Sequence, residues 1–364
     1  MKNGVVMRRA GEKGNFCWPS VARLSDGRFA AVASGFRMDH ICPFGCVAAS
    51  FSEDEGETWS EPVSVFDTPL DDRDAGITAW KKGKVILTTF NNTRLFQRRQ
   101  TSWRTDEKEK ETILSYLSGV SDEEEEKWFG SLWMEADENL RVADWGKLPL
   151  SSPHGMTLLQ DGMLFYVGRK FGHAEVTGRD EPFEEKIGYV AGEDPRRMGD
   201  FCEIPMPRKE REEGVLFCEP HAVQLRSGRI LVMIRAQKEG LFTIYACQSD
   251  DGGRTFSEPE RLRVPEGEFE GSPPHLLETS GGDVVLTYGC RKAPFGQRAR
   301  VSRDGGESWS REIVLRADGK NWDLGYPATA ECADGSLLTV YYQALPQDIN
   351  RSILYTKWRI EEFI

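Results

Sequence analysis

The apolar positions of this chain recur in one short plan. Six segments each hold a brief apolar run, a turn containing Gly, and a second apolar run rich in β-formers, and they begin at residues 19, 75, 153, 220, 274 and 327. "PHAVQLRSGRILVMIR" from Pro220 and "PATAECADGSLLTVYYQ" from Pro327 are clear copies. Each segment therefore predicts two strands joined by a tight turn.

A second motif follows three of these hairpins. It reads "SEDEGETW" at 52–59, "SDDGGRTF" at 249–256 and "SRDGGESW" at 302–309. Its Asp can accept backbone N–H groups in a turn, its Gly supplies a positive φ, and its aromatic ring can pack between repeats. Three copies indicate a structural device, and we expect it to fold the turn between the third and fourth strands of a repeat.

A repeat of about 50 residues with four short strands is typical of a propeller blade. The chain is therefore predicted to be all-β, a six-bladed β-propeller forming a single domain over residues 1–364, with residues near 1–16 or 350–360 closing the ring. The long second interval predicts a helical insertion in blade two over residues 105–145. Ser121 and Glu124 have the spacing of a helix capping box there.

The composition and net charge of the chain limit which classes of partner are expected. The net charge is −12 and the sequence pI is about 5.2, which argues against a nucleic acid or an anionic membrane as the main partner. The N-terminal stretch lacks the apolar core of a signal peptide, and no apolar run reaches membrane-spanning length, so a cytoplasmic location is expected. The eight scattered cysteines are then expected to be free thiols.

In a propeller the first strand of each blade lines the channel, so the residues at its start converge on one rim. Trp18, Arg73, Asp74, Glu219 and Tyr326 stand there, and three histidines follow a proline at the corresponding place: His154, His221 and His275. Three histidines at a channel rim favour a functional role over a structural one, although repeat duplication could also place them.

The second strand of each blade returns to the same rim. In four of the six blades this strand ends in an arginine: Arg37, Arg169, Arg235 and Arg291. A further arginine, Arg298, lies on the segment that follows Arg291. Several guanidinium groups in one pocket of an acidic protein repel each other unless an anion joins them. The pattern predicts a small anion-bearing ligand. The spacing His40-x-Cys42-xxx-Cys46 offers no fourth ligand, so no metal and no cofactor are expected.

Together these features resemble the sialidase (neuraminidase) superfamily and its BNR, or Asp-box, repeats. The segment that opens at Glu219 and closes at Arg235 is similar to one that supplies a Glu and a carboxylate-binding Arg in that superfamily. "GYPATAECADGSLLTVYY" is similar to the segment of the nucleophilic Tyr. The resemblance implies Tyr326 as nucleophile, Glu219 as its base, and Arg235 with Arg291 or Arg298 as carboxylate ligands.

Two departures from the superfamily pattern stand out. Sialidases usually begin with Arg-Ile-Pro, whereas this chain reads Cys17-Trp18-Pro19. The acid/base Asp usually lies shortly after the second strand, where "FRMDHICPFG" offers Asp39 or His40.

Trp18 and Trp322 could each stack on a sugar or pack between blades.

The resemblance implies an exo-acting glycoside hydrolase that removes a terminal acidic sugar from a glycan or oligosaccharide. Two alternatives remain open from the sequence. One is a uronate lyase, in which Arg neutralises the carboxylate while His or Tyr removes the α-proton; the histidines could instead bind a divalent metal. The other is a non-catalytic propeller that binds a glycan or a protein, because fold alone does not fix function.

Overall fold

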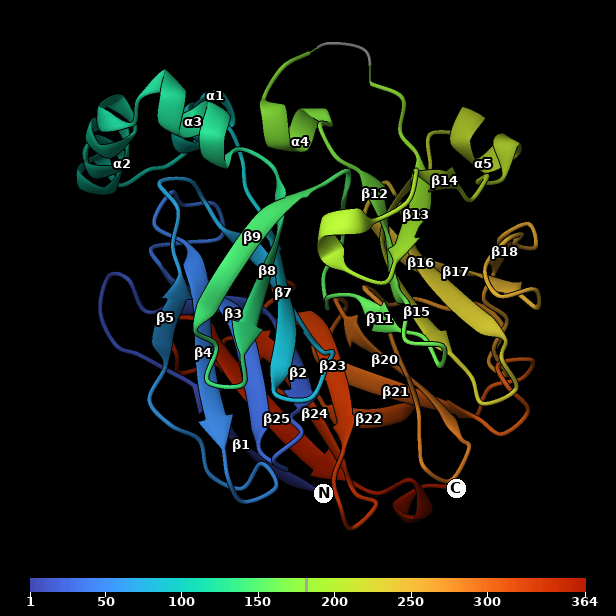
Figure 1. Ribbon diagram of the computed structural model, residues 1–364. Coiled ribbons are helices and arrows are strands. Elements are labelled where there is room, and N and C mark those ends of the chain that lie inside the picture. Colours follow the sequence, from blue (N-terminus) through green and yellow to red (C-terminus); the bar gives the residue numbers. More distant parts are fainter. Residues whose placement is uncertain (181–182) are drawn as a thin grey trace.

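Six antiparallel sheets are arranged around a channel in the computed structural model, which describes residues 1–180 and 183–364 (Figure 1). Blade one holds β2 (Asn15–Arg23), β3 (Phe29–Arg37), β4 (Cys46–Ser52) and β5 (Val63–Phe66). Blade two holds β6 (Arg73–Ala79), β7 (Lys84–Phe90), β8 (Ser131–Asp137) and β9 (Val142–Leu148). Blade three holds β10 (Leu150–Ser151), β11 (Thr157–Leu158), β12 (Leu164–Lys170), β13 (Ile187–Gly192) and β14 (Cys202–Glu203).

The second half of the chain repeats the plan. Blade four holds β15 (Leu216–Gln224), β16 (Ile230–Lys238), β17 (Leu241–Ser249) and β18 (Glu260–Arg261). Blade five holds β19 (His275–Glu278), β20 (Val284–Cys290), β21 (Gly296–Ser302) and β22 (Ile313–Arg316). Blade six holds β23 (Gly325–Glu331), β24 (Leu337–Gln343), β25 (Ser352–Trp358) and β1 (Lys2–Met7). The predicted six-bladed, all-β propeller is confirmed.

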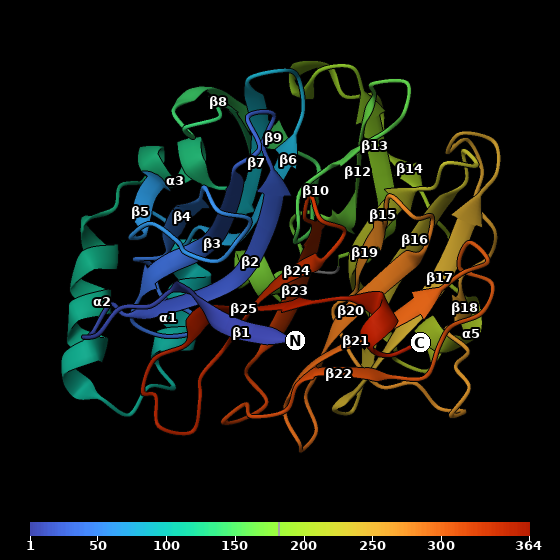
Figure 2. The ribbon, with the colours of Figure 1, turned by 90° about the horizontal axis from the view of Figure 1, so that it is seen from below.

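Blade six closes the ring with strands from both ends of the chain. β1 runs antiparallel to β25, with Asn3 opposite Thr356 (Figure 2). The Thr356 hydroxyl donates to the Asn3 side chain at 2.7 Å. Both segments expected to close the ring therefore take part.

Apolar side chains gather between the blades. Six buried clusters each join two neighbouring blades, because the inner positions of both faces of each sheet are apolar. Phe165 of blade three, for example, packs with Ile230 of blade four, and Trp358 of blade six packs with Val285 of blade five. The hydrophobic core is thus distributed around the channel.

Each Ser-x-Asp-x-Gly motif folds the turn between the third and fourth strands of its blade. In blade four, Asp251 accepts the Ser249 hydroxyl at 2.8 Å, the Thr255 N–H at 2.9 Å and the Thr255 hydroxyl at 2.7 Å. Gly253 has a φ of 86° and donates to the Ser249 hydroxyl. Phe256 packs against the preceding blade. Because strands alternate in direction, these turns lie on the rim away from the start of each inner strand.

Three helices lie between β7 and β8: α1 (Arg94–Thr101), α2 (Glu107–Gly119) and α3 (Asp122–Trp128). The expected bounds of 105–145 were wrong at both ends. Residues 131–148 form β8, which is buried along almost its whole length, and β9, the partly exposed outer strand of the blade. The acidic residues Glu135, Asp137 and Asp144 made this stretch look like a continuation of the charge-rich helices. The Ser121–Glu124 capping box is present. Ile113 and Leu117 of α2 pack on Met38 and Cys42 of blade one.

The remaining helical segments are short: α4 (Ala174–Thr177), α5 (Arg208–Glu212), η1 (Pro195–Arg197) and η2 (Ile360–Glu362). None of the helices that the structure describes is long and apolar enough to cross a membrane. All eight cysteines carry free thiols.

Candidate active site

One backbone position recurs where the inner strands meet the channel. Trp18, Asp74, Glu219 and Tyr326 each stand six residues ahead of the residue that opens the inner hairpin turn, and their φ angles are 51°, 48°, 47° and 51°. Strand pairing shifts register at each of these places. A bulge with a left-handed, non-glycine residue costs about 1–3 kcal/mol and re-aims its side chain. Four blades bear that strain at the channel mouth.

A cavity of about 590 Å³ opens at this rim, on the side of the molecule that carries α1 and α4. Its wall takes side chains from all six blades, some of them from loops between strands, and from both of these helices. The lining includes His40, Arg73, Asp74, Arg169, Glu175, Glu219, Arg235, Phe242, Arg291, Trp322 and Tyr326. That volume suits one or two sugar rings.

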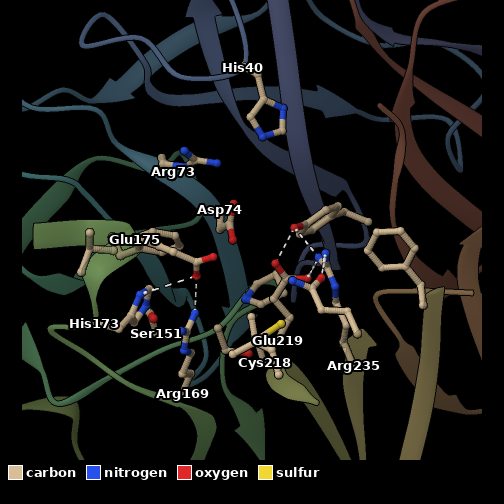
Figure 3. A pocket seen from close by; sticks show the side chains of 18 of the residues that line it. His40, Arg73, Asp74, Ser151, Arg169, His173, Glu175, Cys218, Glu219 and Arg235 are labelled. Atoms are coloured by element: carbon tan, nitrogen blue, oxygen red, sulfur yellow. Dashed lines mark hydrogen bonds and ion pairs between the residues drawn. The ribbon is translucent and has the colours of Figure 1, made fainter. Parts of the chain in front are cut away.

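Tyr326, Glu219 and Arg235 line the cavity and form a hydrogen-bonded cluster, of which Figure 3 labels Glu219 and Arg235. The Tyr326 hydroxyl donates to Glu219 Oε1 at 2.6 Å. Arg235 Nη1 donates to Glu219 Oε2 and, at 3.3 Å, to the Tyr326 hydroxyl. Burial and the Glu219 charge raise the pKa of Tyr326 well above its usual value. The phenol is neutral at pH 7 and has a carboxylate placed to accept its proton.

Two cavity arginines remain available to a ligand. Arg291 lies 5.8 Å from the Tyr326 ring centroid and 5.1 Å from that of Phe242, while Arg73 lies 4.3 Å from the Trp18 ring. Within the described residues, neither guanidinium forms an ion pair, and the Nε of each lacks a hydrogen-bond partner. Blades two and five face each other across the ring, so these two cations approach the cavity from opposite sides.

The structure uses three other predicted ligand arginines differently. Arg37 is fully buried, pairs with Asp71 at 2.6 Å and donates to the His40 carbonyl at 2.9 Å, so it folds the loop after β3. Arg298 is buried outside the cavity and donates to Glu312 and the Pro294 carbonyl. Arg169 lines the cavity, but Glu175 and Glu185 neutralise it. Arg235 and Arg291 are therefore the predicted arginines brought to Tyr326.

His154, His221 and His275 come together but do not line the cavity. Their ring centroids lie 4.3 to 5.5 Å apart, and the His154 ring is 6.4 Å from that of Tyr326. Burial lowers the pKa of all three, that of His221 to about 3, so they are neutral. They also do not share one repeat position: His221 and His275 stand four residues ahead of their turns, His154 five. Among the described residues, no group of three or more His, Cys, Asp or Glu side chains is placed to hold a metal ion.

The two expected acid/base residues are separated. Asp39 lies outside the cavity and pairs with Arg351 at 3.0 Å and Arg104 at 3.6 Å. His40 lines the cavity, and its Nδ1 lies 3.1 Å from Asp323, which also pairs with Arg351. Desolvation lowers the pKa of His40, although the hydrogen bond to Asp323 opposes this.

The two tryptophans also differ. Trp322 is 57% exposed on the cavity wall, where it offers a face to a sugar ring. Trp18 is buried between blades one and six.

Sequence reasoning placed Arg73 at the rim beside Asp74 without naming it as a ligand, and it left Phe242 out of the site. Arg73 was visible as the neighbour of Asp74, but its freedom from acidic partners shows only in three dimensions. Phe242 stands in β17, two residues after a turn, and no motif marks it. It holds Arg235 and Arg291 at equal distances of 5.1 Å from its ring centroid.

Comparison with protein families identifies the repeats. Residues 202–339 match the BNR repeat-like domain. The expected resemblance to sialidase-like BNR-repeat propellers is thereby confirmed at the level of repeat and fold. No curated protein matches the sequence.

Solved structures share the fold at low identity. A protein of unknown function from Dyadobacter fermentans is 20% identical, with a TM-score of 0.73 over 99% of this chain and 98% of that one. An α-L-arabinofuranosidase from Fusarium graminearum is 11% identical, with a TM-score of 0.68 over 99% and 98%. A Trypanosoma rangeli sialidase is 14% identical, with a TM-score of 0.62 over 98% of this chain and 58% of its own. At these identities the likeness shows the fold.

Proposed function

We propose that this protein is an exo-acting, retaining glycoside hydrolase that removes a terminal acidic sugar from a glycan or oligosaccharide. The observation that carries the proposal is the 2.6 Å hydrogen bond from Tyr326 to Glu219 in the wall of the cavity. A neutral phenol with an adjacent carboxylate is an activated nucleophile. The sialidase and the arabinofuranosidase among the structural relatives are glycosidases by name, which supports the same reaction class here.

The charge of the cavity supports an acidic substrate. Arg235 and Arg291 flank Tyr326, and Arg73 faces them from blade two. A carboxylate nucleophile about 4 Å from a substrate carboxylate would suffer roughly 4 kcal/mol of repulsion at an effective dielectric near 20. That cost is almost three powers of ten in rate. A tyrosine avoids it, so the unusual nucleophile and the free arginines fit one substrate class.

In the proposed reaction, the Tyr326 oxygen attacks the anomeric carbon and its proton passes to Glu219. The bond to the leaving oxygen breaks as that oxygen receives a proton from an acid in the cavity. Water then displaces Tyr326, and Glu219 returns the proton to the phenol. Trp322 supplies an apolar face for a sugar ring, and Arg291 holds the carboxylate.

A substrate panel tests the proposal. Purified protein is incubated with 4-methylumbelliferyl glycosides of nonulosonic, ulosonic and uronic acids, each compared with its methyl ester as a matched neutral control. We expect release of fluorophore from at least one free acid, at least about tenfold slower release from its ester because an Arg–carboxylate contact is lost, and a first product that retains the anomeric configuration by NMR.

Two results would contradict this function. If the protein is incubated with uronate oligomers and the absorbance near 235 nm increases with time, an unsaturated sugar is being formed, and the enzyme is a lyase instead. Saturable binding of the sugars without any turnover would identify a binding propeller.

A further inference from the structure

Asp74 is a buried carboxyl group that the fold directs into the cavity. It stands on β6 at the bulge, with a φ of 48°, and is 4% exposed. Figure 3 shows its side chain beside Glu219, between Arg73 and Arg235. The backbone strain at this residue is matched in the same repeat position by Glu219 and Tyr326, the two residues of the proposed reaction.

Among the residues that the structure describes, Asp74 has no ion pair or hydrogen bond to hold its carboxyl group, in contrast to the buried Asp72 and Asp323. Asp72 accepts the Thr68 N–H at 2.7 Å and the Thr68 hydroxyl at 2.9 Å, and Asp323 pairs with Arg351 and accepts the Tyr342 hydroxyl. Within the described residues, Asp74 Oδ1 has no hydrogen-bond partner. A buried carboxyl oxygen without a hydrogen-bond partner destabilises the fold. Its presence therefore points to a function, either contact with a ligand or transfer of a proton.

The charges around Asp74 leave it able to carry a proton near neutrality. Burial raises the pKa of Asp74 to about 7. Arg73 on the same strand opposes the rise, Glu219 of β15 adds to it, and Arg37 of β3 and Arg235 of β16 oppose it. Tyr326 of β23 and Tyr166 of β12 also sense the Asp74 charge.

The two alternatives are poorer acids. Arg351 and Arg104 help to hold the pKa of Asp39 below its usual value against the effect of burial, and Asp39 lies outside the cavity. His40 is neutral at pH 7, and its Nδ1 faces the Asp323 carboxylate, which leaves no transferable proton on Nε2. Asp74 is thus the cavity group best suited to give and take a proton.

We propose that Asp74 is the general acid and base of the glycoside hydrolysis. This inference rests on the proposed function. As Tyr326 bonds to the anomeric carbon, the glycosidic bond breaks and the Asp74 carboxyl gives its proton to the leaving oxygen. In the second step the Asp74 carboxylate takes a proton from water, the water oxygen bonds to the anomeric carbon, and the Tyr326 oxygen leaves and regains its proton from Glu219.

The test uses Asp74→Asn, because asparagine tolerates a left-handed backbone and preserves the shape of the side chain. Two glycosides of the best sugar from the panel are compared, one with a methyl aglycone and one with a 2,4-dinitrophenyl aglycone that leaves without protonation. We expect kcat/KM of Asp74→Asn to fall by about 10²–10³-fold on the methyl glycoside, and by less than about tenfold on the activated one. Because the acid must be protonated, wild-type kcat/KM on the methyl glycoside falls as pH rises through about 7, and Asp74→Asn loses this limb.

Asp39→Asn is the matched control, because it removes the same charge outside the cavity, and it keeps both the limb and the aglycone dependence. A substrate-free measurement accompanies the kinetics: infrared difference titration of the wild type shows a protonated-carboxyl band that is lost near pH 7 and is missing from Asp74→Asn. Equal loss on both aglycones, or an unchanged band in Asp74→Asn, overturns the acid/base role while leaving an active wild type as support for the proposed function. A wild type inactive on every glycoside overturns the proposed function and this role with it.

Discussion

The chemistry of the site depends on the phenolic oxygen of Tyr326. The variant Tyr326→Phe removes that oxygen and leaves the Glu219–Arg235 ion pair in place. We expect kcat/KM on the best acidic glycoside to fall by roughly 10³-fold or more, the effect of losing a catalytic group. The melting temperature, measured by calorimetry, should change little because the ring keeps its packing.

The chain contains its own control for this variant. Tyr288 is also buried, donates to a carboxylate (Glu312, 2.9 Å) and accepts from an arginine (Arg300, 3.1 Å), but it lies in the core of blade five. Tyr288→Phe should lower stability and spare turnover. Near-native turnover by Tyr326→Phe would exclude Tyr326 as the nucleophile.

Individual site residues were predictable only where a repeat fixed their position. Glu219, Asp74 and Tyr326 begin inner strands, so the strand pattern alone placed them at one rim. Asp39 was misplaced because it lies in a loop, whose path is set by the ion pairs of Arg37 and Arg351 and not by periodicity. Whether an arginine is free to bind a ligand depends on which carboxylates lie near it. These carboxylates come from distant parts of the chain, so the sequence pattern did not reveal them.

At the scale of elements, the Asp-box turns stabilise the blades from the rim opposite the cavity. Asp251→Ala removes the acceptor of the Ser249 and Thr255 hydrogen bonds, so we expect calorimetry to show a melting temperature several degrees lower. Turnover per folded molecule should be unchanged. The matched control is Asp250→Ala, which removes the same charge next door and breaks only an exposed ion pair with Arg229.

The pH dependence of this effect has a defined sign. Hydrogen bonds from Thr255 hold the pKa of Asp251 well below the ordinary value of 3.8. A depressed pKa stabilises the fold above the unfolded-state pKa, and this contribution is lost as pH falls below it. The difference in melting temperature between wild type and Asp251→Ala should therefore be full above about pH 4 and shrink at lower pH. A constant difference across that range would argue against the hydrogen-bond account.

Elements with a strict repeat were readable from sequence, and the insertion was not. The inner hairpins can be recognised in the sequence by their alternating apolar residues and by the Gly in the turn. Strand β9 lacks this pattern because it is the outer strand of its blade, faces solvent and takes charged residues. Strand β8 is buried, but its Glu135 and Asp137 continue the charge-rich stretch that precedes it. The helices α1 to α3 begin earlier than their charge-rich composition suggested, since α1 is capped by Thr93 and buries Phe96.

At the scale of the whole molecule, stability depends on closing the ring between the two ends of the chain. β1 completes blade six by pairing with β25, and it buries Val6 and Met7. Each such side chain contributes about 1.5–3 kcal/mol. A variant lacking residues 1–7 would lose this burial and leave β25 as an open edge. We expect its melting temperature to fall by about 10 °C, with increased aggregation.

The loss should be repairable in trans, because β1 contributes a strand and not a site residue. A synthetic peptide of residues 1–9 added to the truncated protein should raise the melting temperature in a concentration-dependent way, as expected for ligand binding to the native state. A peptide of scrambled order is the control, since it keeps composition but loses the register that sets Asn3 opposite Thr356. β1 is the outermost strand of blade six and none of its residues lines the cavity, so activity per folded molecule should survive both truncation and rescue. Equal rescue by the scrambled peptide, or an unchanged melting temperature after truncation, would show that the ring is held closed by blade packing alone.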